Sequence, residues 1–322
     1  MIKKGIQIIL LALCLGSASA QEDASYAMYI FNNLYFNPAY TGSNDGLSAN
    51  AIYRHQWSFL ENAPKSFTLG IHAPLKNERF ALGLHANNDR LGITIMNSVM
   101  ATFAYRIPMN FGKNARFSIG IQAGFKHFNH NFREVNATLP VNDPVFQQNL
   151  AAFTPNAGLG IQLKSDDYII GLSVPNLIAN QVSTFNNQNN VITKFEIADI
   201  PVWASAGYVF TVNKFIKIKP YVLAKYSRAQ PLNIDFNLGF HLAETFYIGG
   251  LFRYNNSGGI IAALDLSKQW RVGYAYELSS WNSVKGANRG THEFMLSFDI
   301  NHPKTSKTCK CRVINPRQYR YF

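Results

Sequence analysis

The stretch FSIGIQAGFK, residues 117–126, alternates apolar residues with small or polar ones at every position. Successive side chains of a β-strand point to opposite faces, so a period of two predicts a strand with one apolar and one more polar face. The same alternation recurs in FTLGIHA (67–73), IDFNLGFH (234–241), WRVGYAY (270–276) and FMLSFDI (294–300). The pattern therefore predicts an all-β protein.

About fourteen segments of this kind follow one another along the chain. They are residues 46–57, 64–74, 78–87, 97–108, 115–126, 154–164, 167–174, 202–210, 215–226, 232–241, 244–253, 258–266, 269–277 and 291–300. An even number of segments, each near ten residues, is typical of an outer-membrane barrel. A soluble β-sandwich or jelly roll also alternates, so the segments alone leave that alternative open.

The connections between the segments favour the barrel. Those after even-numbered segments are short, at 75–77, 109–114, 165–166, 211–214, 242–243 and 267–268, whereas the longest, 127–153, 175–201 and 278–290, follow odd-numbered ones. Outer-membrane barrels have short periplasmic turns and long extracellular loops. We therefore expect a transmembrane antiparallel β-barrel of about 14 strands over residues 46–300, with both termini in the periplasm.

Composition and the first residues agree with export to a membrane. Lys3 and Lys4, a short apolar run at 8–15 and the small residues of 18–20 predict a signal peptide over residues 1–20, which would also remove Cys14. The rest of the chain contains no run of about 18 apolar residues, so we expect no membrane-spanning helix. The chain has 15% charged and 14% aromatic residues, and its net charge of +12 is scattered without a nucleic-acid motif. We expect contact with membrane lipid and none with nucleic acid.

Residues 21–45 precede the first strand and are rich in aromatic residues. A barrel of this size is too wide for its own strand side chains to fill, so this segment either plugs the lumen or lies across the periplasmic mouth. Glycines at inward positions, such as Gly120 and Gly273, leave room for a segment packed inside. Lys217, Lys219 and Lys225 share one face of a strand and would project inward, as a positive lumen lining or as a solvated wall paired with acids.

Aromatic residues near the strand ends predict the interfacial belts of a membrane protein. They are Trp57, Tyr105, Tyr168, Trp203, Tyr226, Trp270 and Tyr276.

No metal motif, nucleotide-binding loop or nucleophile elbow is present, so we expect neither a cofactor nor an enzyme. His72 and His85, with Asp89 nearby, would face the lumen, where a histidine on a solvated polar face is commoner than a catalytic one. Cys309 and Cys311 supply only two of the four ligands of a structural metal site.

The tail, residues 301–322, is basic and contains no acid. It is either a periplasmic docking arm for an acidic partner or a disordered solvated tail, and its ending Tyr319-Arg320-Tyr321-Phe322 favours docking. Its basic residues are Lys304, Lys307, Lys310, Arg312, Arg317 and Arg320.

Several motifs together resemble one family. They are YIFNNLYFNPAYTGS (29–43), Arg54-His55-Gln56-Trp57 followed by Ala63-Pro64, Asp143-Pro144-Val145-Phe146, GLSVPNL (171–177), GYAY (273–276), Gly290-Thr291-His292-Glu293 and Pro316-Arg317-Gln318-Tyr319. This set resembles the PorP/SprF family, outer-membrane proteins of the type IX secretion system of Bacteroidetes. The resemblance runs over the whole mature chain.

The resemblance implies a non-enzymatic component of that system, linked to gliding motility. Such a component would support the secretion or surface anchoring of adhesin cargo that carries a type B C-terminal sorting domain, and would contact periplasmic and outer-membrane machinery. The candidate partner-binding residues are Asn37, Pro38, Tyr40, Arg54, Gln56, Trp57, Asp143, Pro144, Phe146, Lys310, Arg312, Arg317 and Arg320. The alternatives are a passive channel for small solutes and a barrel enzyme.

Overall fold

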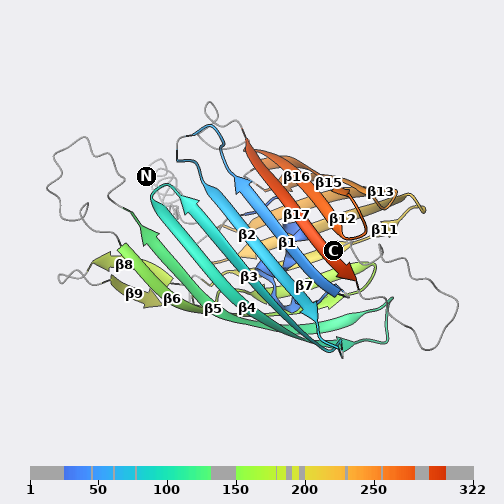
Figure 1. The fold of residues 1–322 in the computed structure, drawn as a ribbon, viewed down its shortest axis with the longest axis horizontal. Coiled ribbons are helices and arrows are strands. Elements are labelled where there is room, and N and C mark those ends of the chain that lie inside the picture. Colours follow the sequence, from blue (N-terminus) through green and yellow to red (C-terminus); the bar gives the residue numbers. More distant parts are fainter. Residues whose placement is uncertain are drawn as a thin grey trace, which may run out of the picture.

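The chain forms a closed antiparallel β-barrel in the computed structural model (Figure 1). The structure describes residues 25–301 except 45, 61, 77, 132–149, 179, 186–190, 196–199, 229–230, 255–256 and 280–289. No helix in this described part is long and apolar enough to cross a membrane.

Fourteen strands make the wall. They are β1 (Gly46–His55), β2 (Lys65–Pro74), β3 (Phe80–Leu91), β4 (Thr94–Pro108), β5 (Arg116–His130), β6 (Leu150–Lys164), β7 (Tyr168–Val174), β10 (Val202–Tyr208), β12 (Ile216–Tyr226), β13 (Asn233–Leu242), β14 (Phe246–Arg253), β15 (Ser257–Asp265), β16 (Trp270–Ser279) and β17 (Thr291–Asn301). Each pairs with its neighbour in sequence, β1 pairs with β17, and β10 pairs with β12. The predicted barrel and its strand number are thus confirmed. The two-residue strand β11 (Phe210–Thr211) extends β10 along β12 after an interruption at Val209.

The two rims differ. The end where β1 begins at Gly46 and β17 ends at Asn301 carries short connections, and we call it the turn rim. The opposite end, where β1 ends at His55, is the loop rim. It carries the longest connections, one of which holds the hairpin of β8 (Asn180–Phe185) and β9 (Val191–Phe195).

Strands β3 to β6 run further toward the loop rim than the alternation predicted. Residues 88–96 were expected to be a loop, but β3 and β4 pair continuously through Leu91 and Thr94, and only two residues join them. β5 and β6 likewise pair out to His130 and Leu150. Polar residues such as Asn87, Asn88 and Asp89 interrupted the apolar pattern without interrupting the backbone ladder, because ladder hydrogen bonds do not depend on side-chain polarity.

The alternation fixes the two faces of the wall. Apolar residues such as Phe67, Leu69 and Ile71 of β2 are exposed on the outside, while the residues between them are buried inside. Trp203 departs from the expected belt of interfacial aromatics. It is only 7% exposed and stacks on Phe36 inside the barrel, because its place in β10 has inward parity.

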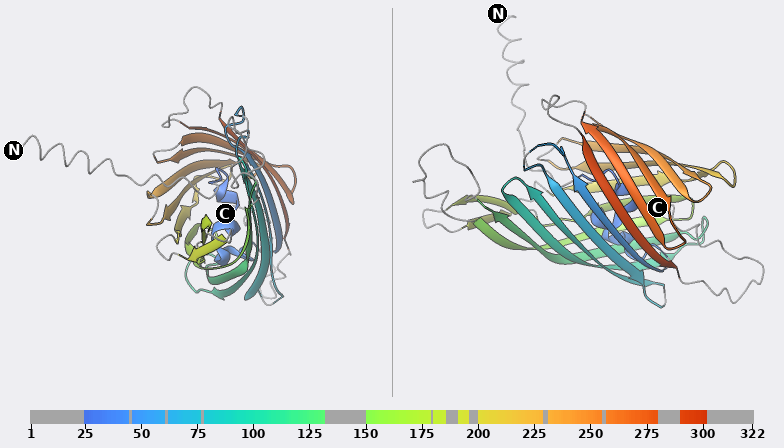
Figure 2. Two further views of the ribbon diagram at one scale, coloured as in Figure 1. Left: turned by 90° about the vertical axis from the view of Figure 1, so that its left-hand side faces the viewer. Right: turned by 45° about the horizontal axis from the view of Figure 1, so that its top comes forward.

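Residues 25–44 lie within the ring of strands (Figure 2). They form three short helical turns, η1 (Tyr29–Phe31), α2 (Asn33–Phe36) and η2 (Pro38–Tyr40), and we call them the lumen segment. They supply much of the core. Residue Asn37 begins the last turn, because its side chain accepts a hydrogen bond from the amide of Ala39 and Pro38 occupies the first helical position.

The lumen segment crosses the barrel from one rim to the other. The carbonyl of Ser25 accepts a hydrogen bond from Arg253, which ends β14 at the loop rim, whereas Asn44 hydrogen-bonds to Asp299 near the turn rim. Ser25 and Asn301 therefore lie at opposite rims. Counting strands predicted that both ends of the chain lie at one rim; those ends lie outside the described residues, and that count took no account of a segment that runs through the lumen.

Candidate functional site

The lumen segment is held at the loop rim by the carboxylate of Glu293 on β17. The backbone amides of Ala27 and Met28 donate to its two oxygens at 2.7 and 2.9 Å. Two successive amides on one carboxylate form a bidentate anchor, and the Glu293 side chain is only 1% exposed. This anchor fixes where the segment enters the barrel.

Glu293 belongs to a buried ionic network that spans several strands. Arg54 of β1 contacts Glu293 and lies 3.0 Å from the carboxylate of Glu277 on β16. Arg253 of β14 pairs with Glu277 at 2.6 Å and with Asp235 of β13 at 2.9 Å, and so links these two carboxylates. Removing one partner of a buried pair leaves an uncompensated charge, so we expect the loss of any one of these residues to destabilise the barrel.

The middle of the segment packs against the wall by close backbone approach. A Cβ built on Gly120 of β5 would overlap with the backbone of Pro38 and Ala39, and one on Gly273 of β16 would meet Met28. The side-chain amide of Asn37 donates to the backbone carbonyl of Ile161 at 3.2 Å. The inward glycines therefore accommodate the segment inside the lumen, which is one of the two positions that the sequence left open.

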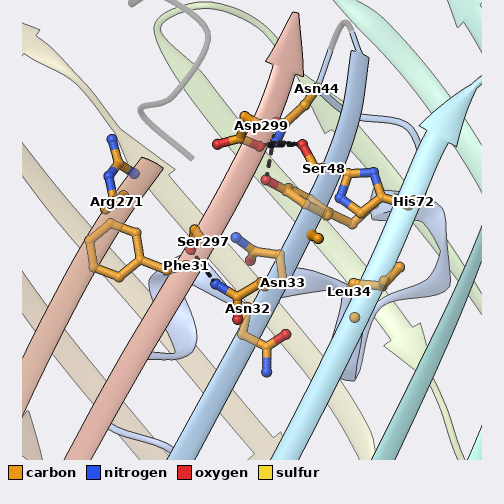
Figure 3. A pocket seen from close by; sticks show the side chains of 14 residues that line it. Phe31, Asn32, Asn33, Leu34, Asn44, Ser48, His72, Arg271, Ser297 and Asp299 are labelled. Atoms are coloured by element: carbon orange, nitrogen blue, oxygen red, sulfur yellow. Dashed lines mark hydrogen bonds between the residues drawn. The ribbon is translucent and has the colours of Figure 1, made fainter. Parts of the chain in front are cut away.

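At the turn rim the segment ends in polar contacts (Figure 3). The side-chain amide of Asn44 donates to the Ser48 hydroxyl at 2.6 Å and to the Asp299 carboxylate at 3.3 Å. The Ser48 hydroxyl also donates to the Asp299 carboxylate. The amide of Gly42 donates to Nδ1 of His72 at 3.0 Å, so this ring nitrogen acts as an acceptor. The chain is thus held at both ends of the lumen.

The three lysines of β12 face inward as predicted. Lys217 lies 3.4 Å from the carboxylate of Glu244. Lys219 lies over the rings of Phe31 and Tyr247, and Lys225 lies over the ring of Trp203 at 5.3 Å. All three side chains are buried, so the predicted lumen lining is confirmed and the alternative of a solvated wall is wrong.

The structure gathers some of the predicted partner-binding residues and not others. Asn37, Pro38 and Tyr40 are buried in the lumen segment, and Arg54 is in the ionic network. The remaining predicted residues fall into two groups. Gln56 and Trp57 follow β1 at the loop rim, while Asp143, Pro144, Phe146, Lys310, Arg312, Arg317, Arg320 and both Cys309 and Cys311 lie outside the described residues.

The residues that sequence reasoning missed are the other members of the ionic network that contains Arg54. Glu277, Glu293 and Arg253 stand at inward positions of otherwise apolar or small strand patterns, which was the available indication of a buried network. Alternation alone gives the face of a residue but not its neighbour across strands.

His72 and His85, the candidate catalytic histidines, both make structural contacts. His72 accepts from Gly42, and Nε2 of His85 lies 3.3 Å from the Gln122 side chain. Within the described ranges, no group of three or more His, Cys, Asp or Glu side chains could hold a metal ion. His72 thus holds the lumen segment through Gly42, and His85 packs against Tyr35 of the same segment.

Comparison with known proteins gives one family and a set of barrels. The chain matches the sequence model of the family described as type IX secretion system membrane protein PorP/SprF over residues 18–298. No curated protein matches it. Among solved structures, CymD, a monoaromatic hydrocarbon channel, is similar over 84% of this chain and 93% of its own, with 11% identity and a TM-score of 0.53.

A second solved structure, the outer membrane protein Omp33 of Acinetobacter baumannii, is similar over 81% of this chain and all of its own. Its identity is 8% and its TM-score is 0.46. At such identities the likeness to CymD concerns the outer-membrane barrel fold alone.

Proposed function

The chain belongs to the PorP/SprF family of type IX secretion system membrane proteins, and from this premise we propose that it is a docking barrel of the outer membrane. Its loop rim holds secreted cargo on one side, and its turn rim engages the machinery on the other. It is neither a solute channel nor an enzyme.

The observation that carries this proposal is the occupied lumen. A passive channel needs a continuous water-filled path, yet residues 25–44 cross the barrel and are buried against its inner wall. The segment is anchored at Glu293 near one rim and at Asp299 near the other. Such a barrel suits binding on its two faces better than transport through its centre.

The proposed orientation places the turn rim in the periplasm and the loop rim outside, as short turns and long loops are placed in outer-membrane barrels. The basic C-terminal tail that follows Asn301 then starts in the periplasm. Ser25 lies at the outer side. The four residues between the expected mature start at Gln21 and Ser25 span at most about 14 Å. The apolar band of an outer-membrane barrel is about 25 Å tall, so the start of the mature chain would also lie on the outer side.

The proposed cargo is an adhesin with a type B C-terminal sorting domain, and the proposed process includes gliding motility. The outer candidates for its binding are Gln56, Trp57 and the loop residues Asp143, Pro144 and Phe146. The periplasmic candidates are the tail residues Lys310, Arg312, Arg317 and Arg320, whose charge suits an acidic partner.

The test is affinity capture of the full-length protein from detergent-solubilised outer membranes, followed by mass spectrometry. We expect other type IX components and sorting-domain cargo among the captured proteins. A variant that ends at Asn301 should keep the cargo and lose periplasmic partners. Capture of neither class by the intact protein would contradict the docking role.

A further inference from the structure

A row of basic side chains crosses the outer wall at the loop rim. His292 of β17 pairs with His55 of β1, His55 pairs with Lys65 of β2, and Lys65 pairs with Arg90 of β3. These four strands lie side by side in Figure 1. Lys65 and Arg90 are exposed and the two histidines are half-buried, all on the outward parity of their strands. At about 4.8 Å between strands, the row is about 15 Å wide.

The row is local to these four strands. Followed through the same backbone pairing in one direction, it continues with Tyr276 of β16 and Ile260 of β15. In the other direction it continues with Ile95 of β4 and Asn129 of β5. The basic character is therefore a feature of one part of the wall and not of the whole rim.

The pairing of Lys65 with Arg90 places two positive charges directly opposite each other. Like charges at directly opposed positions of antiparallel strands are destabilising. The acids within these four strands, Glu293, Asp299 and Asp89, all have inward parity, so the outward row presents basic side chains. An anion bound outside would relieve this repulsion.

Toward the middle of the barrel, the wall next to the row is apolar on β17, β1 and β2, whereas β3 carries the exposed Asn88 and then Ala86 at the corresponding positions. The next outward row contains Phe294, Tyr53 and Phe67, and the one after it contains Leu296, Ala51 and Leu69. A charged row, then an aromatic row, then an aliphatic row is the polarity profile of a lipid with an anionic headgroup.

His292 is held in place within this profile. Its Nδ1 lies 2.7 Å from the hydroxyl of Tyr274, and its ring centroid lies 5.1 Å from that of Tyr276. A fixed imidazole with Nε2 on the far side of this contact can donate to an anion in the row.

We infer that the outer wall of β17, β1, β2 and β3 binds the phosphate of lipid A, the phosphorylated glycolipid of the outer leaflet. Arg90 and Lys65 supply the charge, because guanidinium and ammonium groups both pair strongly with phosphate. The histidines add donors, and the apolar rows carry the acyl chains. The choice of lipid A rests on the proposed orientation, in which the loop rim faces outward.

The test measures the lipid that stays with the full-length protein after purification in mild detergent. Lipid A is quantified per barrel by phosphate content and by its 3-hydroxy acyl chains, which separate it from phospholipid. The double variant Lys65→Gln/Arg90→Gln is compared with the charge-matched control Arg228→Gln/Lys268→Gln, whose residues are exposed elsewhere on the barrel. Lys65→Arg should behave like the unchanged protein.

The Lys65→Gln/Arg90→Gln variant should lose about tenfold or more of the lipid A, since each basic residue at the lipid surface contributes independently. The control should lose little. Equal retention by both variants, equal loss from both, or phospholipid alone on the unchanged protein would overturn the inference. The result does not depend on capture of secretion components, so failure of one proposal is distinguishable from failure of the other.

Discussion

At the scale of single residues, the lumen segment depends on places where a side chain is missing. Gly120 faces Ala39 so closely that a methyl group would overlap with its backbone, whereas a Cβ on Gly250 would meet nothing within 4 Å. We expect Gly120→Ala to reduce the free energy of unfolding by about 1–3 kcal/mol through overpacking. Gly250→Ala is the matched control and should be neutral, as measured by urea titration in lipid vesicles. Equal stability of the two variants would contradict the close approach.

Glu293 gives a second prediction at this scale. Glu293→Gln keeps an acceptor for one backbone amide but loses the charge that faces Arg54, which stays buried. Unfolding should become easier by about 3 kcal/mol, the typical cost of breaking a buried ion pair. Proteinase K should also cut faster within residues 25–44. The control Glu78→Gln, a half-exposed acid paired with Arg116, should change neither measurement.

The sequence predicted residue orientation better than residue partners. Alternation placed Lys217 and Lys219 correctly on the inner face, because parity along a strand needs no knowledge of the neighbouring strand. It did not pair Arg54 with Glu293, since that needs the register of β1 against β17. Trp203 was assigned to the membrane interface from its residue type alone, although the parity of its own strand placed it inside.

At the scale of elements, strand existence was predictable and strand ends were not. The turn residues after β2 and β6 marked those boundaries. The hairpin at the end of β3 and β4 was missed, because its polar strand residues resemble a loop in sequence. The path of the lumen segment was left open between a plug and a cover, since its aromatic residues suit either position.

The path of the lumen segment predicts which face displays the start of the mature chain. Cysteine is placed at position 24 (Ala24→Cys), at the loop rim (Phe59→Cys) and in a turn-rim connection (Lys268→Cys), each with Cys309→Ser and Cys311→Ser. A membrane-impermeant maleimide applied to whole cells should label the first two and spare the third. If the cysteine at position 24 were spared like Lys268→Cys, the result would contradict the path of the lumen segment through the barrel. The two rim controls report the orientation of the barrel independently.

At the scale of the whole molecule, the fold is that of outer-membrane barrels, some of which are channels. What fills the lumen distinguishes a docking barrel from a channel. Fourteen strands enclose more space than their own side chains fill. Here residues 25–44 occupy that space and link the two rims. The sequence predicted the wall from local periodicity, whereas the occupation of its lumen is a long-range property that periodicity does not carry.

The most direct test of the occupied barrel is the ion conductance of the intact protein. Purified full-length protein is inserted into a planar lipid bilayer, and insertion is verified by protease-protected bands. The account predicts insertion without steady conductance, because the lumen segment is anchored at Glu293 and Asp299. A stable ohmic pore from the unmodified chain would contradict the claim that its lumen is closed.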